Sequence, residues 1–360
     1  SCHTGKQITA SGLQRKDFQT EVNGQHTDLF TLSNKQGMEV CITNYGARVV
    51  SILVPDRNGK REDVVCGFST ITEYMEQRQN FGSTVGRYIG RILNARFTLD
   101  GVEYKLVPNN GKSGHISHGG NPGFADRIWK VEQADTHRVC LSYLSPDGEN
   151  GFPGNLKVTL VYSLGEDDNA LDLTYEATTD APTVLNLSHH SFFNISGNFT
   201  KSVEDQQLWV DADRFTPYDD KKCVTGEYLP VAGTPLDFRM PHTIGECIDA
   251  DHPQLKVVNG YDHTWELNTK GDDTRPAAWV YDPASGRKME IFTTEPGMQI
   301  YTGNGLKGKM TGKGGIAYPF RSAVCFETMH FQDSPNQPGF PSTVLRPGEV
   351  FRSHTVYKFE

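Results

Sequence analysis

From residue 28 to residue 55 the chain reads DLFTLSNKQGMEVCITNYGARVVSILVP. Three short stretches rich in strand-forming residues occupy 28–33, 38–43 and 49–54, and turn residues separate them. The third stretch ends at Pro55–Gly59, where proline, asparagine and glycine supply the backbone angles that turns need. This part of the chain therefore predicts consecutive β-strands joined by short turns.

The same rhythm of short strands and turns continues toward the C-terminal end. Two strands around Asp100–Gly101 predict a hairpin. Further strands are expected at 138–144, 156–164, 170–178, 207–210, 277–281, 289–294, 299–302 and 324–328. One helix is expected at 70–79, with Ser69 as its N-cap, and no series of helices alternates with the strands. We therefore predict an all-β sandwich or barrel, with one domain over 17–360 and an N-terminal leader or linker over 1–16.

Composition excludes several classes of protein. Of the 360 residues, 36% are hydrophobic and 10% aromatic, which is too apolar for a disordered chain. No uninterrupted apolar run has the length that a membrane span needs. The formal net charge of -9 argues against nucleic acid as a partner, because binding phosphates requires a basic face. A small neutral ligand fits this composition better.

The first residues, Ser1-Cys2-His3, resemble the start of a processed bacterial lipoprotein, in which the cysteine accepts the lipid. We therefore expect an exported, periplasmic protein whose membrane tether, if any, is a lipidated Cys2. A trimmed N-terminus with a residual serine is the alternative, and it leaves a cytoplasmic location open. The sequence also leaves open whether the chain is a monomer or a dimer.

No metal or cofactor is expected. The seven cysteines include no pair at C-x-x-C spacing, which argues against a zinc site. His189 and His190 are adjacent in an expected strand, so their side chains point to opposite faces and cannot readily bind one ion. Nucleotide-binding and nucleophile-elbow motifs are absent from the sequence. Cys41, Cys66 and Cys325 lie in apolar stretches, as Cys140 does, and are expected to be buried free thiols.

Five clusters of polar and aromatic residues depart from the strand pattern. They are GRYIGRI at 86–92, HISHGG at 115–120, NLSHHSFFN at 186–194, NGYDHTW at 259–265 and FETMHFQDSPNQPGFP at 326–341. Taken singly, the first could be an ion-paired strand edge, the second a structural loop histidine and the fourth a capped turn. Glu327 follows the apolar run 323–326, where burial raises the pKa of a carboxyl toward that of a useful base. Paired histidines with flanking Asn and Ser suit a general acid.

Together these clusters resemble the aldose 1-epimerase, or galactose mutarotase-like, family over about Phe18 to Phe359. The matching stretches are 44–47, 64–68, 86–92, 117–120, 147–154, 186–194, 233–238, 260–263, 294–304 and 327–341. The resemblance implies a single large antiparallel β-sandwich, the galactose mutarotase-like supersandwich, with a sugar cleft across one sheet. It also implies interconversion of the α and β anomers of free aldohexoses such as galactose and glucose, without a cofactor.

The resemblance also implies roles for individual residues. By position Glu327 matches the general base, His190 the general acid and His118 a second active-site histidine. The sugar-binding positions are matched by Arg91, Asp262 and Gln299. Three departures from the family pattern lie close to these matches in sequence: His189 and Gly90 stand where Asn is usual, and the last motif carries Met329 and Gln332. They bear on sugar preference, since we expect them beside the ligand.

The implied reaction opens the pyranose ring and closes it on the other face of C1. Glu327, as carboxylate, would take the C1 hydroxyl proton while His190, as imidazolium, donates to the ring oxygen. Three other functions remain open at this point. A carbohydrate-binding module would need no proton-transfer groups, and a phosphohexose epimerase would need additional cations, for which Arg87 is a candidate. A glycoside hydrolase would need a second carboxylate facing Glu327, for which Asp262 is the candidate.

Overall fold

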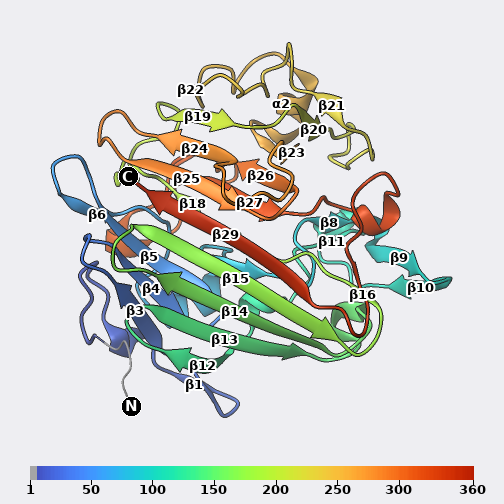
Figure 1. Ribbon diagram of the computed structural model, residues 1–360, viewed down its shortest axis with the longest axis horizontal. Coiled ribbons are helices and arrows are strands. Elements are labelled where there is room, and N and C mark those ends of the chain that lie inside the picture. Colours follow the sequence, from blue (N-terminus) through green and yellow to red (C-terminus); the bar gives the residue numbers. More distant parts are fainter. Residues whose placement is uncertain (1–5) are drawn as a thin grey trace.

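The computed structural model describes residues 6–360, and strands make up most of its regular structure. The largest sheet has nine strands, which cross the front of Figure 1. In spatial order they are β12 (Lys130–Ala134), β13 (Arg138–Ser145), β14 (Leu156–Leu164), β15 (Ala170–Thr179), β29 (Phe351–Phe359), β25 (Lys288–Thr293), β24 (Ala278–Tyr281), β19 (Gln207–Val210) and β22 (His242–Thr243). β29, near the C-terminus, therefore lies in the interior of this sheet, between β15 and β25.

Two smaller sheets lie behind the nine-stranded sheet (Figure 1). One has six strands: β18 (Phe192–Phe193), β27 (Val324–Met329), β26 (Gly297–Tyr301), β23 (Asp262–Glu266), β20 (Arg214–Thr216) and β21 (Leu229–Pro230). The other has four: β3 (Leu29–Ser33), β4 (Glu39–Thr43), β5 (Arg48–Pro55) and β6 (Arg61–Asp63). The last sheet confirms the strands expected from residues 28–55.

Within residues 6–360, five two-stranded pairs and two helices complete the regular elements apart from short 3₁₀ turns. The pairs are β1 (Glu21–Val22) with β2 (Gln25–His26), β7 (Ser83–Val85) with β17 (Ser188–His190), β8 (Arg91–Ile92) with β11 (Ile116–Ser117), β9 (Arg96–Leu99) with β10 (Val102–Lys105), and β16 (Thr183–Val184) with β28 (Val344–Leu345). The helices are α1 (Ile71–Gln77) and α2 (Pro253–Val258). The β9–β10 pair confirms the hairpin expected around Asp100–Gly101.

The main hydrophobic core lies between the nine-stranded sheet and the two smaller sheets. Leu160 of β14 and Tyr357 of β29 share this core with Val40 of β4 and Phe326 of β27. The other face of the nine-stranded sheet is less covered, so β14 alternates between buried and more exposed residues. All pairings between the named strands are antiparallel, which confirms the expected all-β sandwich.

The smaller sheets are covered on both faces, and this explains their continuous apolar sequences. Along β27, Val324 and Phe326 face the main core, whereas Cys325 belongs to a second apolar cluster on the opposite face. Successive side chains of a strand point to opposite faces, so Glu327 lies on the same side as Cys325. A carboxylate two residues along from a buried cysteine is thereby placed on a largely enclosed face.

The helices differ from expectation in detail. α1 begins after Thr70, whose side chain accepts a hydrogen bond from the Glu73 amide, so Thr70 rather than Ser69 is the N-cap. α2 was not expected from the sequence. Its six residues are too few to show helical periodicity, although Pro253 at its start and Asn259 in the left-handed conformation at its end are typical boundary residues.

The N-terminal segment is described from residue 6 onward, so Cys2 lies outside the described residues. Within the expected leader, Leu13 is buried, and the amides of Ala10 and Ser11 donate to the Glu39 carboxylate at 2.8 and 3.1 Å. Among residues 6–360, no helix is both long and apolar enough to cross a membrane. The cysteines from Cys41 to Cys325 are free thiols; those at 41, 66 and 325 are buried, whereas Cys140 is only partly so.

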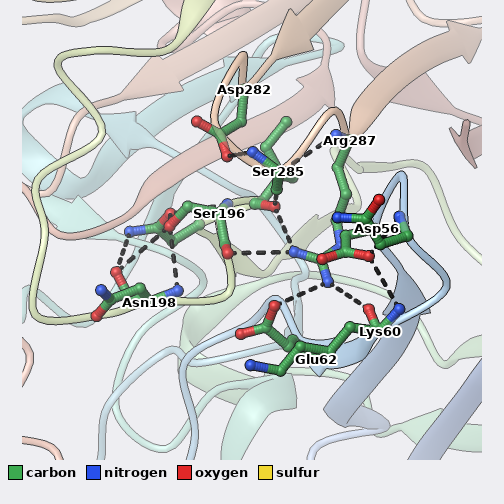
Figure 2. A network of polar contacts seen from close by, with 11 residues as sticks. Asp56, Lys60, Glu62, Ser196, Asn198, Asp282, Ser285 and Arg287 are labelled. Atoms are coloured by element: carbon green, nitrogen blue, oxygen red, sulfur yellow. Dashed lines mark hydrogen bonds and ion pairs between the residues drawn. The ribbon is translucent and has the colours of Figure 1, made fainter.

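A buried arginine, Arg287, connects the loop in which it lies to two other loops. Figure 2 shows Arg287 between the turn that carries Lys60 and Glu62 and the loop of Ser196. Its guanidinium donates to the carbonyl oxygens of Lys60 at 3.0 Å and Ser196 at 3.1 Å, and to the Glu62 carboxylate at 3.2 Å. The side chain is 1% exposed. These bonds satisfy loop carbonyls where little water can reach.

Arg287→Met is expected to lower the free energy of unfolding by about 3 kcal/mol, because the variant leaves buried acceptors without donors. Urea denaturation with linear extrapolation measures this change. Arg352→Met is the matched control, since Arg352 is 69% exposed and pairs with Glu176, which is 55% exposed. Its expected effect is under about 0.5 kcal/mol, and equal losses in both variants would contradict the role given to Arg287.

Candidate active site

A cavity of about 360 Å³ opens beside the six-stranded sheet. It is lined by residues from strands and loops that are distant in sequence. Those with polar side chains are Gln79, Asn80, Arg91, Ser117, His118, His190, Tyr218, Lys222, Asp262, Gln299, Tyr301, Glu327 and Gln332. All six residues singled out from the sequence are therefore brought to one cavity.

Three neighbouring strands place the acidic and amide groups. Glu327 of β27 is paired across the ladder with Gln299 of β26, and Gln299 is paired with Thr264 of β23. Asp262 lies two residues before Thr264 and therefore on the same face of its strand. The Gln299 side-chain amide donates to the Asp262 carboxylate at 2.8 Å. Strand register thus fixes the spacing of these groups, which a loop would leave adjustable.

His190 and Glu327 form a buried pair. The imidazole Nε2 of His190 lies 3.3 Å from Oε1 of Glu327, and both side chains are almost fully buried. His190 ends β17, which pairs with β7, and its ring stacks on Phe192 with 5.0 Å between centroids. The packing on Phe192 holds the imidazole plane in place, and the other ring nitrogen, Nδ1, has no hydrogen-bond partner.

Burial shifts the pKa values of this pair in opposite directions. It raises the pKa of Glu327 well above its ordinary value, and the nearby charge of Asp262 adds to the rise. It lowers the pKa of His190 well below its ordinary value, with a smaller contribution from His118. Burial therefore disfavours the form of the pair in which an imidazolium faces a carboxylate. A pair of titratable groups in contact at 3.3 Å can hold one proton between them, which suits reversible acid–base chemistry.

His118 lies against His190 from a tight loop. The two rings meet at right angles with 5.4 Å between centroids. The loop is closely packed: a Cβ at Gly119, whose φ is +80°, would stand 2.0 Å from the Gly86 carbonyl oxygen. His118 Nδ1 accepts the Gly90 amide at 3.1 Å, and burial lowers its pKa to about 4. At neutral pH its proton is therefore on Nε2, which makes His118 a neutral hydrogen-bond donor.

Arg91 and Asp262 complete the set of expected residues. The Arg91 guanidinium donates to the Lys222 carbonyl oxygen at 2.7 Å, which ties the arginine to the loop around residue 222. Burial raises the pKa of Asp262 to about 6, against the opposing effects of the Gln299 hydrogen bond and the Arg91 charge. The cavity thus offers both a cation and a carboxylate to the hydroxyl groups of a ligand.

Tyr218 is a cavity residue that sequence reasoning missed. Its hydroxyl donates to the Asp262 carbonyl oxygen at 2.6 Å and accepts the side-chain amides of Gln299 at 3.2 Å and Gln332 at 2.9 Å. Tyr218 lies in a loop whose sequence carries no distinctive motif, so only the assembled fold places it in the cavity. Gln332 was noticed in the sequence, but only as a departure from the family pattern.

The residues that depart from the family pattern do not all line the cavity, and this corrects one expectation. Gly90, Met329 and Gln332 line the cavity, as expected, whereas His189 does not. The His189 ring lies near Tyr162, on the other side of the strand from His190, and its Nε2 lies 2.5 Å from the Ser191 hydroxyl. Alternation along β17 sends adjacent side chains to opposite faces, so His189 is a buried residue behind the site.

One group of metal-ligand types occurs within residues 6–360. Donor atoms of His190, Cys325 and Glu327 all lie within 4.8 Å of one another. A metal would need Cys325 as thiolate, yet burial raises the pKa of this thiol well above its ordinary value. The expected acid–base use of His190 and Glu327 therefore fits their surroundings better than metal coordination does.

The sequence of the chain is similar to those of known proteins. The family model described as aldose 1-epimerase matches residues 28–358. The chain belongs to the aldose 1-epimerase family. Among other members of this family, the galactose mutarotase of Sus scrofa is 39% identical over 330 residues, covering 92% of this chain and 93% of that protein. The aldose 1-epimerase of Escherichia coli (strain K12) is 36% identical over 339 residues, covering 94% and 96%.

Solved structures agree with this assignment. An aldose epimerase homologue from C. elegans superimposes with a TM-score of 0.85 at 31% identity, covering 93% of this chain and 99% of that one. Galactose 1-epimerase from Lactobacillus acidophilus NCFM gives a TM-score of 0.82 at 28% identity, covering 95% and 96%. The fold of the aldose 1-epimerase family therefore extends over nearly the whole chain.

Proposed function

We propose that this protein interconverts the α and β anomers of free aldohexoses such as galactose and glucose, with Glu327 and His190 as its proton-transfer pair. The observation that carries the proposal is the 3.3 Å contact between His190 Nε2 and Glu327 Oε1 in a cavity that also presents Asp262, Gln299 and Arg91. Membership of the aldose 1-epimerase family makes the protein an isomerase acting on aldoses.

The pair suits the reaction because both reacting oxygens of a pyranose are attached to C1. Glu327 takes the proton of the C1 hydroxyl, and His190 delivers a proton to the ring oxygen as the C1–O5 bond breaks. The open aldehyde rotates about C1–C2, and the two residues exchange roles during closure. His118, as a neutral donor, holds the ring oxygen. Asp262, Gln299 and Arg91 bind the remaining hydroxyls and keep the sugar in place.

The other functions have less support from the site. Arg87, considered as a phosphate-binding cation, is buried and donates to the carbonyl oxygens of Pro153 and Gly154 at 2.7 Å each, so it is unavailable to a phosphosugar. A binding module has no use for a buried pair with opposed pKa shifts. Asp262, the second carboxylate that a glycosidase would need, is engaged by Gln299.

Polarimetry of freshly dissolved α-galactose and α-glucose tests the proposal directly. We expect the protein to bring each solution to its equilibrium rotation faster than buffer alone, in proportion to enzyme concentration. A carbohydrate-binding module would bind the sugars without changing the rate. Sugar binding with an unchanged rate would therefore overturn the proposal.

The pH dependence of kcat/KM is expected to be bell-shaped, because only the singly protonated His190–Glu327 pair holds both an acid and a base. At low pH both groups carry protons and no base remains; at high pH both have lost them. Loss of the first proton from the doubly protonated pair sets the acidic limb, and loss of the second sets the basic limb. Initial rates from acidic to mildly alkaline buffers measure the profile, and a flat acidic limb would contradict the pairing.

A further inference from the structure

Gln332 occupies a position in the cavity wall that depends on the glycine at residue 90. A Cβ added at Gly90 would stand 2.6 Å from Cγ and 3.1 Å from Cδ of Gln332. Such distances are closer than van der Waals contact allows, so any larger residue at position 90 would displace the Gln332 side chain. Gly90 therefore provides the space in which the Gln332 amide sits.

Hydrogen bonds fix the orientation of this amide. Its nitrogen donates to the Tyr218 hydroxyl at 2.9 Å and to Gln299 Oε1 at 3.4 Å, which uses both amide hydrogens. Its oxygen accepts the backbone amide of Arg91 at 3.2 Å. An amide oxygen can accept two hydrogen bonds, so one acceptor position on Gln332 Oε1 stays unused.

Two of the three partners of Gln332, Gln299 and Arg91, are residues already expected to bind the sugar. Gln299, one of them, also donates to the Asp262 carboxylate, and Tyr218 donates to the Asp262 backbone. Gln332 as a residue is 7% exposed and lines the cavity. An oriented, nearly buried acceptor in a cavity gains most when a ligand hydroxyl donates to it.

We infer that Gln332 is a further sugar-binding residue, whose Oε1 accepts one hydroxyl of the aldose and whose placement by Gly90 sets discrimination among aldoses. The inference rests on the proposed function for the identity of the ligand. It assigns to positions 90 and 332 a joint role, because the amide reaches its place only when residue 90 has no side chain.

Gln332→Met tests the acceptor, because methionine keeps the side-chain length and removes the amide. We expect KM for galactose or glucose to rise about fivefold, equivalent to about 1 kcal/mol, with kcat changed by less than about twofold. Measurements on monodeoxy analogues identify the hydroxyl: on the analogue that lacks it, Gln332→Met and the parent protein should have equal KM values. A variant that matches the parent on every sugar overturns the inference, as does a KM ratio identical for all analogues.

Gly90→Ala tests the steric part of the inference. We expect its KM to rise by a similar factor, whereas Gly90→Ala combined with Gln332→Ala should show no more than the loss of Gln332→Ala alone. Gly233→Ala is the control for backbone strain, because Gly233 has φ +76° but no atom within 4 Å of its added Cβ, against φ +78° at Gly90. Additive effects in the double variant would overturn the steric link, and thermal unfolding of each variant verifies folding.

The same experiments separate this inference from the proposed function. If the parent protein fails to accelerate anomer exchange, the proposed reaction fails, and calorimetric sugar affinities then replace KM in the Gln332→Met comparison. If the parent protein is active and Gln332→Met has unchanged constants, the reaction stands and the inference fails.

Discussion

Glu327→Gln is expected to lower kcat for anomer interconversion by about 1,000-fold or more, since a positioned base typically contributes about 10²–10⁴-fold. The amide has nearly the same shape as the carboxyl group but cannot take a proton from the C1 hydroxyl. Sugar binding by Asp262, Gln299 and Arg91 should persist, so KM or Kd should change little. Proton NMR exchange spectroscopy or polarimetry at high enzyme concentration measures the residual rate.

Stability provides an independent readout for this variant. Burial raises the pKa of Glu327, so the stability that this group contributes is complete below its unfolded pKa and is lost as pH rises through the folded value. Glutamine carries no charge at any pH, and Glu327→Gln should therefore unfold at a higher temperature than the parent protein in mildly alkaline buffer. Glu266→Gln is the matched control: Glu266 is partly exposed and bonds Arg214 at 2.8 Å, and its loss should leave kcat unchanged. A nearly unaltered rate in Glu327→Gln would remove this residue from the mechanism.

His190→Asn is expected to lower kcat by at least about 100-fold, because the ring oxygen then loses its proton donor as the C1–O5 bond breaks. The pH profile of kcat/KM should also lose its bell shape, because Glu327 would titrate without its partner. The residual pH profile is therefore as informative as the rate. A bell-shaped profile that survives in the variant would show that another group supplies the proton.

His189→Asn is the control for the preceding variant, with the same substitution at the adjacent residue. The His189 ring faces Tyr162 and Ser191 and does not line the cavity. Its pKa is lowered to about 3 by burial, so it is neutral at any pH at which the enzyme would be assayed. We expect kcat to stay within about threefold of the parent value, because the substitution touches no reacting atom. Comparable losses at 189 and 190 would indicate a structural effect.

Local sequence predicted the strands well because their signals are local. The hairpin around Asp100–Gly101 and the strand over 156–164 depend on neighbouring residues alone, and both occur as expected. The order of strands in the sheets follows from contacts between distant segments, which no local pattern contains. The short helix 253–258 was missed for a related reason, since six residues give too few turns to reveal a period.

The candidate site likewise contains residues that the sequence predicted and residues that only the fold reveals. His190 and Glu327 stand out in sequence by residue type and context, but only the fold shows that their side chains touch. Tyr218 has no motif, and its position depends on the loop that packs over the cavity. The expected charge state of His190 also changes in the structure: burial disfavours the imidazolium, so the proton belongs to the pair and not to the histidine alone.

The interior position of β29 has a consequence for how the protein is made. Residues 351–359 form ladders with β15 on one side and β25 on the other, so they join the two halves of the nine-stranded sheet. During translation these residues leave the ribosome after all the others that the sheet contains. Until then the nascent chain exposes two unpaired strand edges, which are prone to aggregation. The nine-stranded sheet can therefore close only once residues 351–359 have been synthesised, and chains that stop before residue 351 are expected to aggregate.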